Sequence, residues 1–171
     1  MHHLLLAGEY RHVVVYSLLI NYPDSRRYHL EVVQHPERTA ETTAVLSRLP
    51  LSPPIVVKLT VEDPDGNTVP ALVLTSLPIQ KLKSESYRHT EMPFLAAHLW
   101  LYDAQGENPV DLVEATPNGT DEPMLYGTLV SSLHHLKDTS GQLGMFFIFP
   151  DVSVRQRGTY TLQVSLLRLA R

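Results

Sequence analysis

The fold class of this 171-residue chain is decided by LYGTLVSSLHHLKDTSGQLGMFFIFPDVSVRQRGTYTLQVSLLRL, which spans Leu125–Leu169. β-Branched and aromatic residues are enriched in three parts of it, which predict three strands. These parts are Leu125–Leu136, Met145–Phe149 and Thr159–Leu169. Because turn-forming Asp, Ser, Gly and Pro residues separate them, the stretch is typical of antiparallel β structure.

Similar patterns extend upstream, separated by turn signals. The expected strands are Tyr28–Gln34, Ile55–Glu62, its hairpin mate Val69–Leu77 after the turn Asp63–Asn67, Phe94–Asp103, and the short return Val110–Val113. The segments 37–54, 78–93 and 116–123 are expected to be loops. Eight or nine short strands without a helical period predict an all-β, antiparallel β-sandwich with long loops.

The domain organisation follows from the same patterns. Val13–Ile20 (VVVYSLLI) is apolar and ends at a turn-forming NYPD, so it is either a first strand or part of an N-terminal extension. We assign residues 1–27 to this extension or extra strand and residues 28–171 to one domain. No segment has the length of a signal-peptide core or a membrane span, so no membrane partner is expected.

Composition narrows the function. The chain has no cysteine, which excludes disulfides, thiolate zinc sites and cysteine nucleophiles. Its net charge of −4 provides no overall basic field for nucleic acid, so any DNA contact must be local. No catalytic or phosphate-binding motif is present, and we expect neither an enzyme nor a cofactor.

Two groups of side chains have both a structural and a functional reading. His134 and His135 suggest a metal site, but neighbours on a strand point to opposite faces and cannot share one ion, so no metal site is expected. Trp100 alternates with His98 and Tyr102 on one face, which we interpret as core or subunit interface. Phe147 and Phe149 share a face that we expect in the core. Phe146 points the other way and is expected in the core or, if exposed, in a dimer contact.

Several segments together resemble the fungal velvet domain over residues 28–169. YHLEVVQHPER (Tyr28–Arg38) is similar to the family's Y-x-L-x-V-x-Q-Q-P-x-R-A-R, and RLPLSPPIVVKL (Arg48–Leu59) to R-R-P-I-D-P-P-P-I-V-x-L. The third match is GTLVSS, LKD, GMFFIFPDVSVR and G-x-Y-x-L within residues 127–162, in the family's order and spacing.

This resemblance implies an immunoglobulin-like β-sandwich related to the Rel/NF-κB DNA-binding fold. It also implies a nuclear regulator of fungal development, sporulation and secondary metabolism, shuttling with the cytoplasm. The expected partners are other velvet proteins, as homo- or heterodimers, promoter DNA, and a methyltransferase-like regulator. The family pattern usually continues through a closing segment beyond the position of Arg171, so we expect that segment to be lacking here.

The resemblance implies that Arg38 and Arg48, in the loop after Gln-His-Pro, contact DNA. Lys137 is a third candidate, because it follows an expected strand. The family's second arginine of Arg-Ala-Arg is replaced here by Ala40, and residues 34–50 are formally neutral. Because each lost phosphate contact weakens binding, this loop alone is expected to bind DNA poorly. The densest basic cluster is Lys81, Lys83, Arg88 and His89, read as a solvated loop or an auxiliary contact.

Three functions remain open from the residues. The leading one is a dimerising, DNA-binding velvet regulator. The second is a velvet module that does not bind DNA and pairs with a more basic velvet partner. The third is an immunoglobulin-like adhesion or carbohydrate-binding sandwich, which the absence of a signal segment and of cysteines disfavours.

Overall fold

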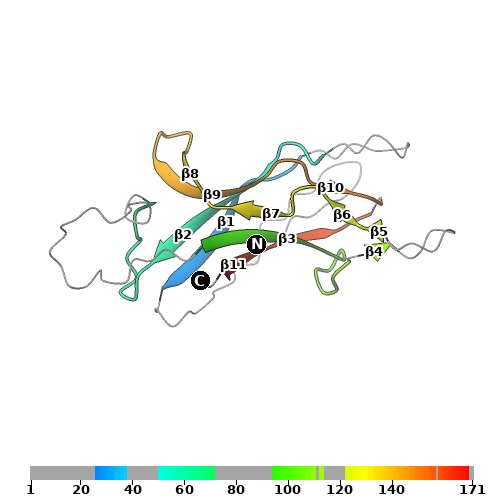
Figure 1. The fold of residues 1–171 in the computed structure, drawn as a ribbon, viewed down its shortest axis with the longest axis horizontal. Coiled ribbons are helices and arrows are strands. Elements are labelled where there is room, and N and C mark those ends of the chain that lie inside the picture. The colour runs from blue at the N-terminus through cyan, green and yellow to red at the C-terminus, as the bar shows by residue number, and fades with distance from the viewer. Residues whose placement is uncertain are drawn as a thin grey trace.

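The computed structural model describes residues 26–37, 50–71, 94–110, 112–113, 122–156 and 158–169 (Figure 1). Its strands are β1 (Arg27–Gln34), β2 (Ile55–Glu62), β3 (Phe94–Tyr102), β4 (Leu112–Val113), β5 (Glu122–Pro123), β6 (Leu125–Tyr126), β7 (Val130–Ser132), β8 (His134–Lys137), β9 (Leu143–Phe149), β10 (Ser153–Val154) and β11 (Thr161–Leu169). Over these ranges no helix has the length and apolar character needed to cross a bilayer.

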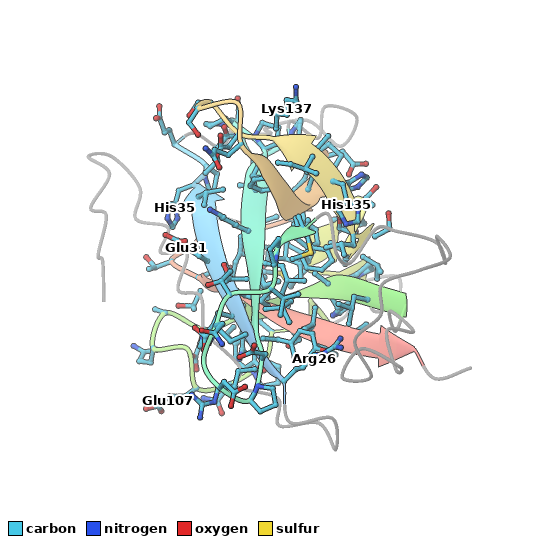
Figure 2. The ribbon with its side chains drawn as sticks, turned by 90° about the vertical axis from the view of Figure 1, so that its left-hand side faces the viewer. Arg26, Glu31, His35, Glu107, His135 and Lys137 are labelled. Atoms are coloured by element: carbon cyan, nitrogen blue, oxygen red, sulfur yellow. The ribbon has the colours of Figure 1, made fainter. Side chains whose placement is uncertain are left out.

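The strands form two larger antiparallel sheets and two small ones. One larger sheet has the order β1-β2-β9-β8 and the other the order β11-β3-β7, while β10 pairs with β6 and β4 with β5. Figures 1 and 2 show the two larger sheets as layers whose strands cross at an angle. The all-β antiparallel sandwich expected from the sequence is therefore confirmed.

A single apolar core lies between the two larger sheets. Alternate residues of β2, β3, β9 and β11 are buried, which is the period-two pattern of strands with one face inward. The largest fully buried side chains include Tyr28, Phe147 and Phe149. Each such side chain contributes about 1.5–3 kcal/mol by leaving water. The expected core positions of Phe147 and Phe149 are confirmed.

The expected strand Leu125–Leu136 is divided into three short strands in three different sheets. Its residues become β6, β7 and β8, which pair with β10, β3 and β9 respectively. The first break falls at Gly127, whose φ of +100° is a backbone conformation that other residues rarely adopt. The prediction of one strand is wrong because apolar composition does not reveal where a chain crosses between sheets.

Two expected hairpins are confirmed only where they begin. The turn after β2 forms as expected, with Asp63 accepting the Asn67 N–H at 2.8 Å, and the Val69 N–H then donates to the Val61 carbonyl of β2 at 2.8 Å. Pro70, the next residue, belongs to no strand. Proline has no N–H to donate to a ladder. Residues 72–77 of the expected mate lie outside the described ranges, as do Val13–Ile20 and the expected loop 78–93. Of the expected return Val110–Val113, the Val110 N–H donates to the Leu101 carbonyl of β3 at 2.8 Å, whereas Leu112–Val113 pairs with Glu122–Pro123.

Candidate nucleic-acid interface

The two arginines that the sequence assigns to DNA lie in a part of the chain that the structure does not describe. Arg38 and Arg48 both fall within residues 38–49. The flanking residues Glu37 and Pro50 are described, so the base from which this segment departs is known. That base determines where the two arginines can be presented.

Hydrogen bonds hold both ends of residues 38–49 at the same end of the four-stranded sheet. The Glu37 N–H donates to the Ser52 carbonyl at 2.9 Å, which joins the chain before the segment to the chain after it. The Leu51 N–H donates to the Val152 carbonyl at 2.7 Å, just past the end of β9. Because the backbone is paired on both sides, the segment begins and ends on a well-anchored support.

A second pair of loops adjoins this base. The Thr128 N–H donates to the Asp151 carboxylate at 2.8 Å. This hydrogen bond lowers the pKa of Asp151, since it stabilises the ionised form. Gly127 approaches the same residue so closely that an added Cβ would collide with the Asp151 carbonyl oxygen. Asp151 is therefore a fixed negative charge at this end of the sandwich.

Arg155, three residues beyond Val152, has structural partners. Its guanidinium carbon lies 4.6 Å from the centre of the Tyr126 ring, and its Nε donates to the Pro123 carbonyl at 3.2 Å. Both contacts join the chain after β10 to the β5–β6 region. The half-buried Arg155 side chain thus connects the chain after β10 to the β5–β6 region and stabilises both.

The charges of the described residues around the base do not favour DNA binding. Glu37 and Asp151 are exposed and acidic, and the Arg155 side chain is engaged with its neighbours. Since phosphate contacts dominate DNA affinity, the described residues around the base provide little attraction for DNA. The roles of Arg38 and Arg48 stay predictions.

Lys137 lies away from this base. It is exposed at the end of β8 and pairs with Leu143, the first residue of β9. Phe149, at the other end of β9, pairs with Ile55 near the base of residues 38–49. The length of β9 separates the two ends by roughly 20 Å. Figure 1 shows the β8–β9 hairpin at the opposite end of the sheet, and Figure 2 shows Lys137 on it. The structure does not bring Lys137 to that base.

The sequence also singled out a histidine pair and a basic cluster, and the structure describes only the histidine pair. His134 pairs with Phe146 and His135 with Met145, so the two histidines point to opposite faces of the sheet, as expected. Among the residues described, no three His, Asp or Glu side chains are grouped to hold a metal ion. The cluster Lys81, Lys83, Arg88 and His89 lies outside the described ranges.

For Phe146 and Trp100 the sequence left two environments open, and the burial of each side chain excludes one of them. Phe146 is on the outer face, yet its side chain is only 6% exposed. Its ring lies against Gly144, where an added Cβ would be 2.7 Å from a ring carbon. Trp100 is 39% exposed and outside the core cluster, which rules out its core assignment.

Comparison with known proteins identifies the relatives of the chain. The family model described as Velvet factor matches residues 28–122 and 111–171. The spore development regulator vosA of Cochliobolus sativus is 39% identical over 84 residues, covering 49% of this chain and 22% of that protein. A velvet complex subunit of Chaetomium globosum is 35% identical over 151 residues, covering 84% of this chain and 27% of that protein.

A third relative is the developmental and secondary metabolism regulator veA of Aspergillus flavus. It is 32% identical over 145 residues, which cover 81% of this chain and 22% of that protein. The chain thus spans between about a fifth and just over a quarter of the length of these three relatives.

Proposed function

Because this chain belongs to the velvet factor family, we propose that it is a regulator of fungal development, sporulation and secondary metabolism that acts together with other velvet proteins. The observation that carries the proposal is the family match over residues 28–171. Relatives with these printed roles include a spore development regulator, a velvet complex subunit and a secondary metabolism regulator. The adhesion or carbohydrate-binding alternative is not retained, since it lies outside the family.

In the leading form of this proposal, the protein is a nuclear, dimerising transcription factor that shuttles with the cytoplasm. Arg38 and Arg48 anchor phosphates and contact a few bases from the segment whose ends are tied at Glu37 and Leu51. Arginine suits both tasks, because its planar fork matches phosphate oxygens and guanine edges. A rigid sandwich that presents a loop supports this form of recognition.

A second form keeps the velvet partner and omits direct DNA contact. It is favoured by the acidic Glu37 and Asp151 at the base of the segment and by the net charge of −4. In this form the partner protein brings the basic surface. A methyltransferase-like regulator is a further proposed partner of the pair.

A salt titration of DNA binding separates the two forms. Affinity of the chain for a labelled duplex is measured between about 50 and 200 mM salt, where each phosphate contact contributes about −0.9 to the logarithmic slope. Arg38→Ala and Arg48→Ala are each expected to reduce that slope by about 1. Arg27→Ala is the matched control, because Arg27 is exposed at the far end of β1 from Glu37.

Each outcome decides between the forms. A steep wild-type slope that falls in the two variants and not in the control supports direct contact. A slope near zero for the chain alone, with DNA binding only when the velvet complex protein of Chaetomium globosum is added, supports the second form. No association with a velvet protein, together with no DNA binding, contradicts both. Imaging a tagged chain in fungal cells tests the nuclear location, which exclusively cytoplasmic signal would refute.

A further inference from the structure

The end of β1 carries a side-chain hydrogen bond in addition to the backbone ladder. The side-chain amide of Gln34 donates to the Pro54 carbonyl at 2.7 Å, and this bond is partly buried. It joins residues 20 positions apart in the chain, on the two sides of residues 38–49. Figure 2 shows β1 and β2 side by side, with His35 at the end of β1 that leads to these residues. Gln34 therefore connects the chain before the segment to the chain after it.

A β-bulge lies at the same place in β1. Val32 pairs with Val57, but Gln34 pairs with Val56, so the register shifts by one residue between the two pairs. A bulge bends its strand, and it can redirect a side chain or end the regular pairing. Here the regular pairing of β1 with β2 ends at Gln34, the residue whose side chain reaches Pro54.

The sequence before β2 offers carbonyls at this place and few backbone donors. Pro53 and Pro54 have no N–H, so they cannot donate to a ladder with β1. A carbonyl that is shielded from water and lacks a donor is costly. The Gln34 side chain supplies the donor to Pro54, and the Glu37 N–H supplies the donor to Ser52. We call these two hydrogen bonds, Gln34–Pro54 and Glu37–Ser52, the clamp.

The clamp limits where Arg38 and Arg48 can lie. Arg38 follows Glu37 directly in the chain, and Arg48 is followed by Leu51 after two residues. Because a chain spans at most about 3.3–3.6 Å per residue, the Cα atom of Arg48 stays within roughly 11 Å of that of Leu51. Leu51 is itself bonded to the Val152 carbonyl. Short stretches of chain thus hold both arginines close to the clamp.

We propose that Gln34 is a positioning residue for DNA binding, which holds the two ends of residues 38–49 together so that Arg38 and Arg48 reach the duplex from one fixed base. The inference rests on the DNA contact proposed above for these arginines and adds an uncharged residue to it. Gln34 acts through the backbone and does not itself touch DNA. Fixing the ends of a segment before it binds lowers the ordering cost of binding. Loss of the clamp should therefore weaken DNA binding without removing a phosphate contact.

Gln34→Met tests the side-chain amide, because methionine has a similar length and no donor. Its affinity for the labelled duplex should fall about two- to twelvefold at constant salt, the range that corresponds to one hydrogen bond. The logarithmic salt slope should keep its wild-type value, since no phosphate contact is lost. Arg38→Ala and Arg48→Ala differ from this variant, because they are expected to lower the slope.

Amide hydrogen exchange of the free protein measures the clamp in the absence of DNA. The Glu37 amide should exchange about two- to twelvefold faster in Gln34→Met, because its hydrogen bond to Ser52 opens more often. The Leu99 amide, which donates to the Leu129 carbonyl at 2.8 Å, should exchange at the wild-type rate. An unchanged rate at Leu99 shows that the rest of the fold is intact.

Gln142→Met is the matched control. Gln142 is exposed in the turn between β8 and β9, at the far end of the sheet from the clamp. This variant should change neither the exchange of the Glu37 amide nor the affinity for DNA. Equal effects of the two methionines would overturn the assignment.

The two measurements together decide the role of Gln34. Faster exchange of the Glu37 amide with unchanged DNA affinity would reduce Gln34 to a structural residue. Weaker DNA binding with unchanged exchange would make Gln34 a direct DNA contact. Either result overturns the proposal. A wild-type chain that binds no DNA overturns the proposed DNA contact and this role with it, whereas a wild-type chain that binds DNA no better than Gln34→Met overturns the role of Gln34 alone.

Discussion

The rings of His98 and Trp100 meet edge to face, with centroids 4.3 Å apart and planes inclined at 70°. Both side chains come from outward positions of β3, two residues apart, so the contact follows from the alternation of the strand. The Nδ1 atom of His98 is buried and has no hydrogen-bond partner within the described structure. A neutral imidazole held against an indole is therefore a local feature of the outward face of the β11-β3-β7 sheet.

Protonation of His98 should be visible in the fluorescence of Trp100. Burial lowers the pKa of His98 below its ordinary value of 6.5, so the emission should change with a midpoint below 6.5. Because the folded state binds the proton less readily than the unfolded state, stability is present above the unfolded pKa and is lost as pH falls through the folded pKa. His98→Gln should abolish the midpoint. His134→Gln, on the other large sheet, should retain it, and loss in both variants would contradict the assignment.

Gly127→Ala should destabilise the fold more than Gly141→Ala. Both glycines have positive φ, +100° and +80°, so both substitutions strain the backbone by about 1 kcal/mol or more. Only at Gly127 would the new Cβ also meet a carbonyl, that of Asp151, whereas nothing lies within 4 Å at Gly141. Urea unfolding should give Gly127→Ala the larger loss, by about 2 kcal/mol. Equal losses of unfolding free energy in the two variants would show that the structure accommodates the new Cβ beside the Asp151 carbonyl without destabilisation.

Asp151→Asn should flatten the loss of stability in acid. The Thr128 N–H lowers the pKa of Asp151 in the folded state, so its ionised form stabilises the fold above the unfolded value near 3.9. That contribution disappears as pH falls through the lowered pKa. The variant should be less stable than wild type at pH 7 and more nearly equal to it once the pH lies below the lowered pKa. Glu107→Gln, at an exposed position, controls for the change in net charge. If the two variants showed the same dependence of stability on pH, the role of Asp151 would be contradicted.

Arg155→Lys should weaken the fold without weakening DNA binding. Lysine keeps the charge but loses the planar group that lies over Tyr126 and the Nε that donates to Pro123. The expected loss is about 1 kcal/mol in urea unfolding. The salt slope of any DNA binding should equal that of wild type. A reduced slope with unchanged stability would instead identify Arg155 as a phosphate contact.

Much of the fold can be predicted because its signals are local. The expected strand Ile55–Glu62 forms β2 with those bounds, since its alternating side chains are buried and half-buried in turn. Phe94–Asp103 likewise contains β3. Leu125–Leu136 reads as one strand because composition along the chain does not show the change of partner at Gly127. The DNA residues Arg38 and Arg48 are assigned from family resemblance, and their geometry lies outside the described ranges.

The sequence by itself determined the family and the all-β class, because motif order and period-two alternation are properties of neighbouring residues. Only the tertiary structure decided which sheet each short strand joins, since strand pairing depends on residues far apart in the chain. It also placed Lys137 across β9 from the base of residues 38–49. In the same way, only the pairing of β3 with β7 and β11 shows which side of β3 faces away from the core, and Trp100 lies on that side as a surface residue.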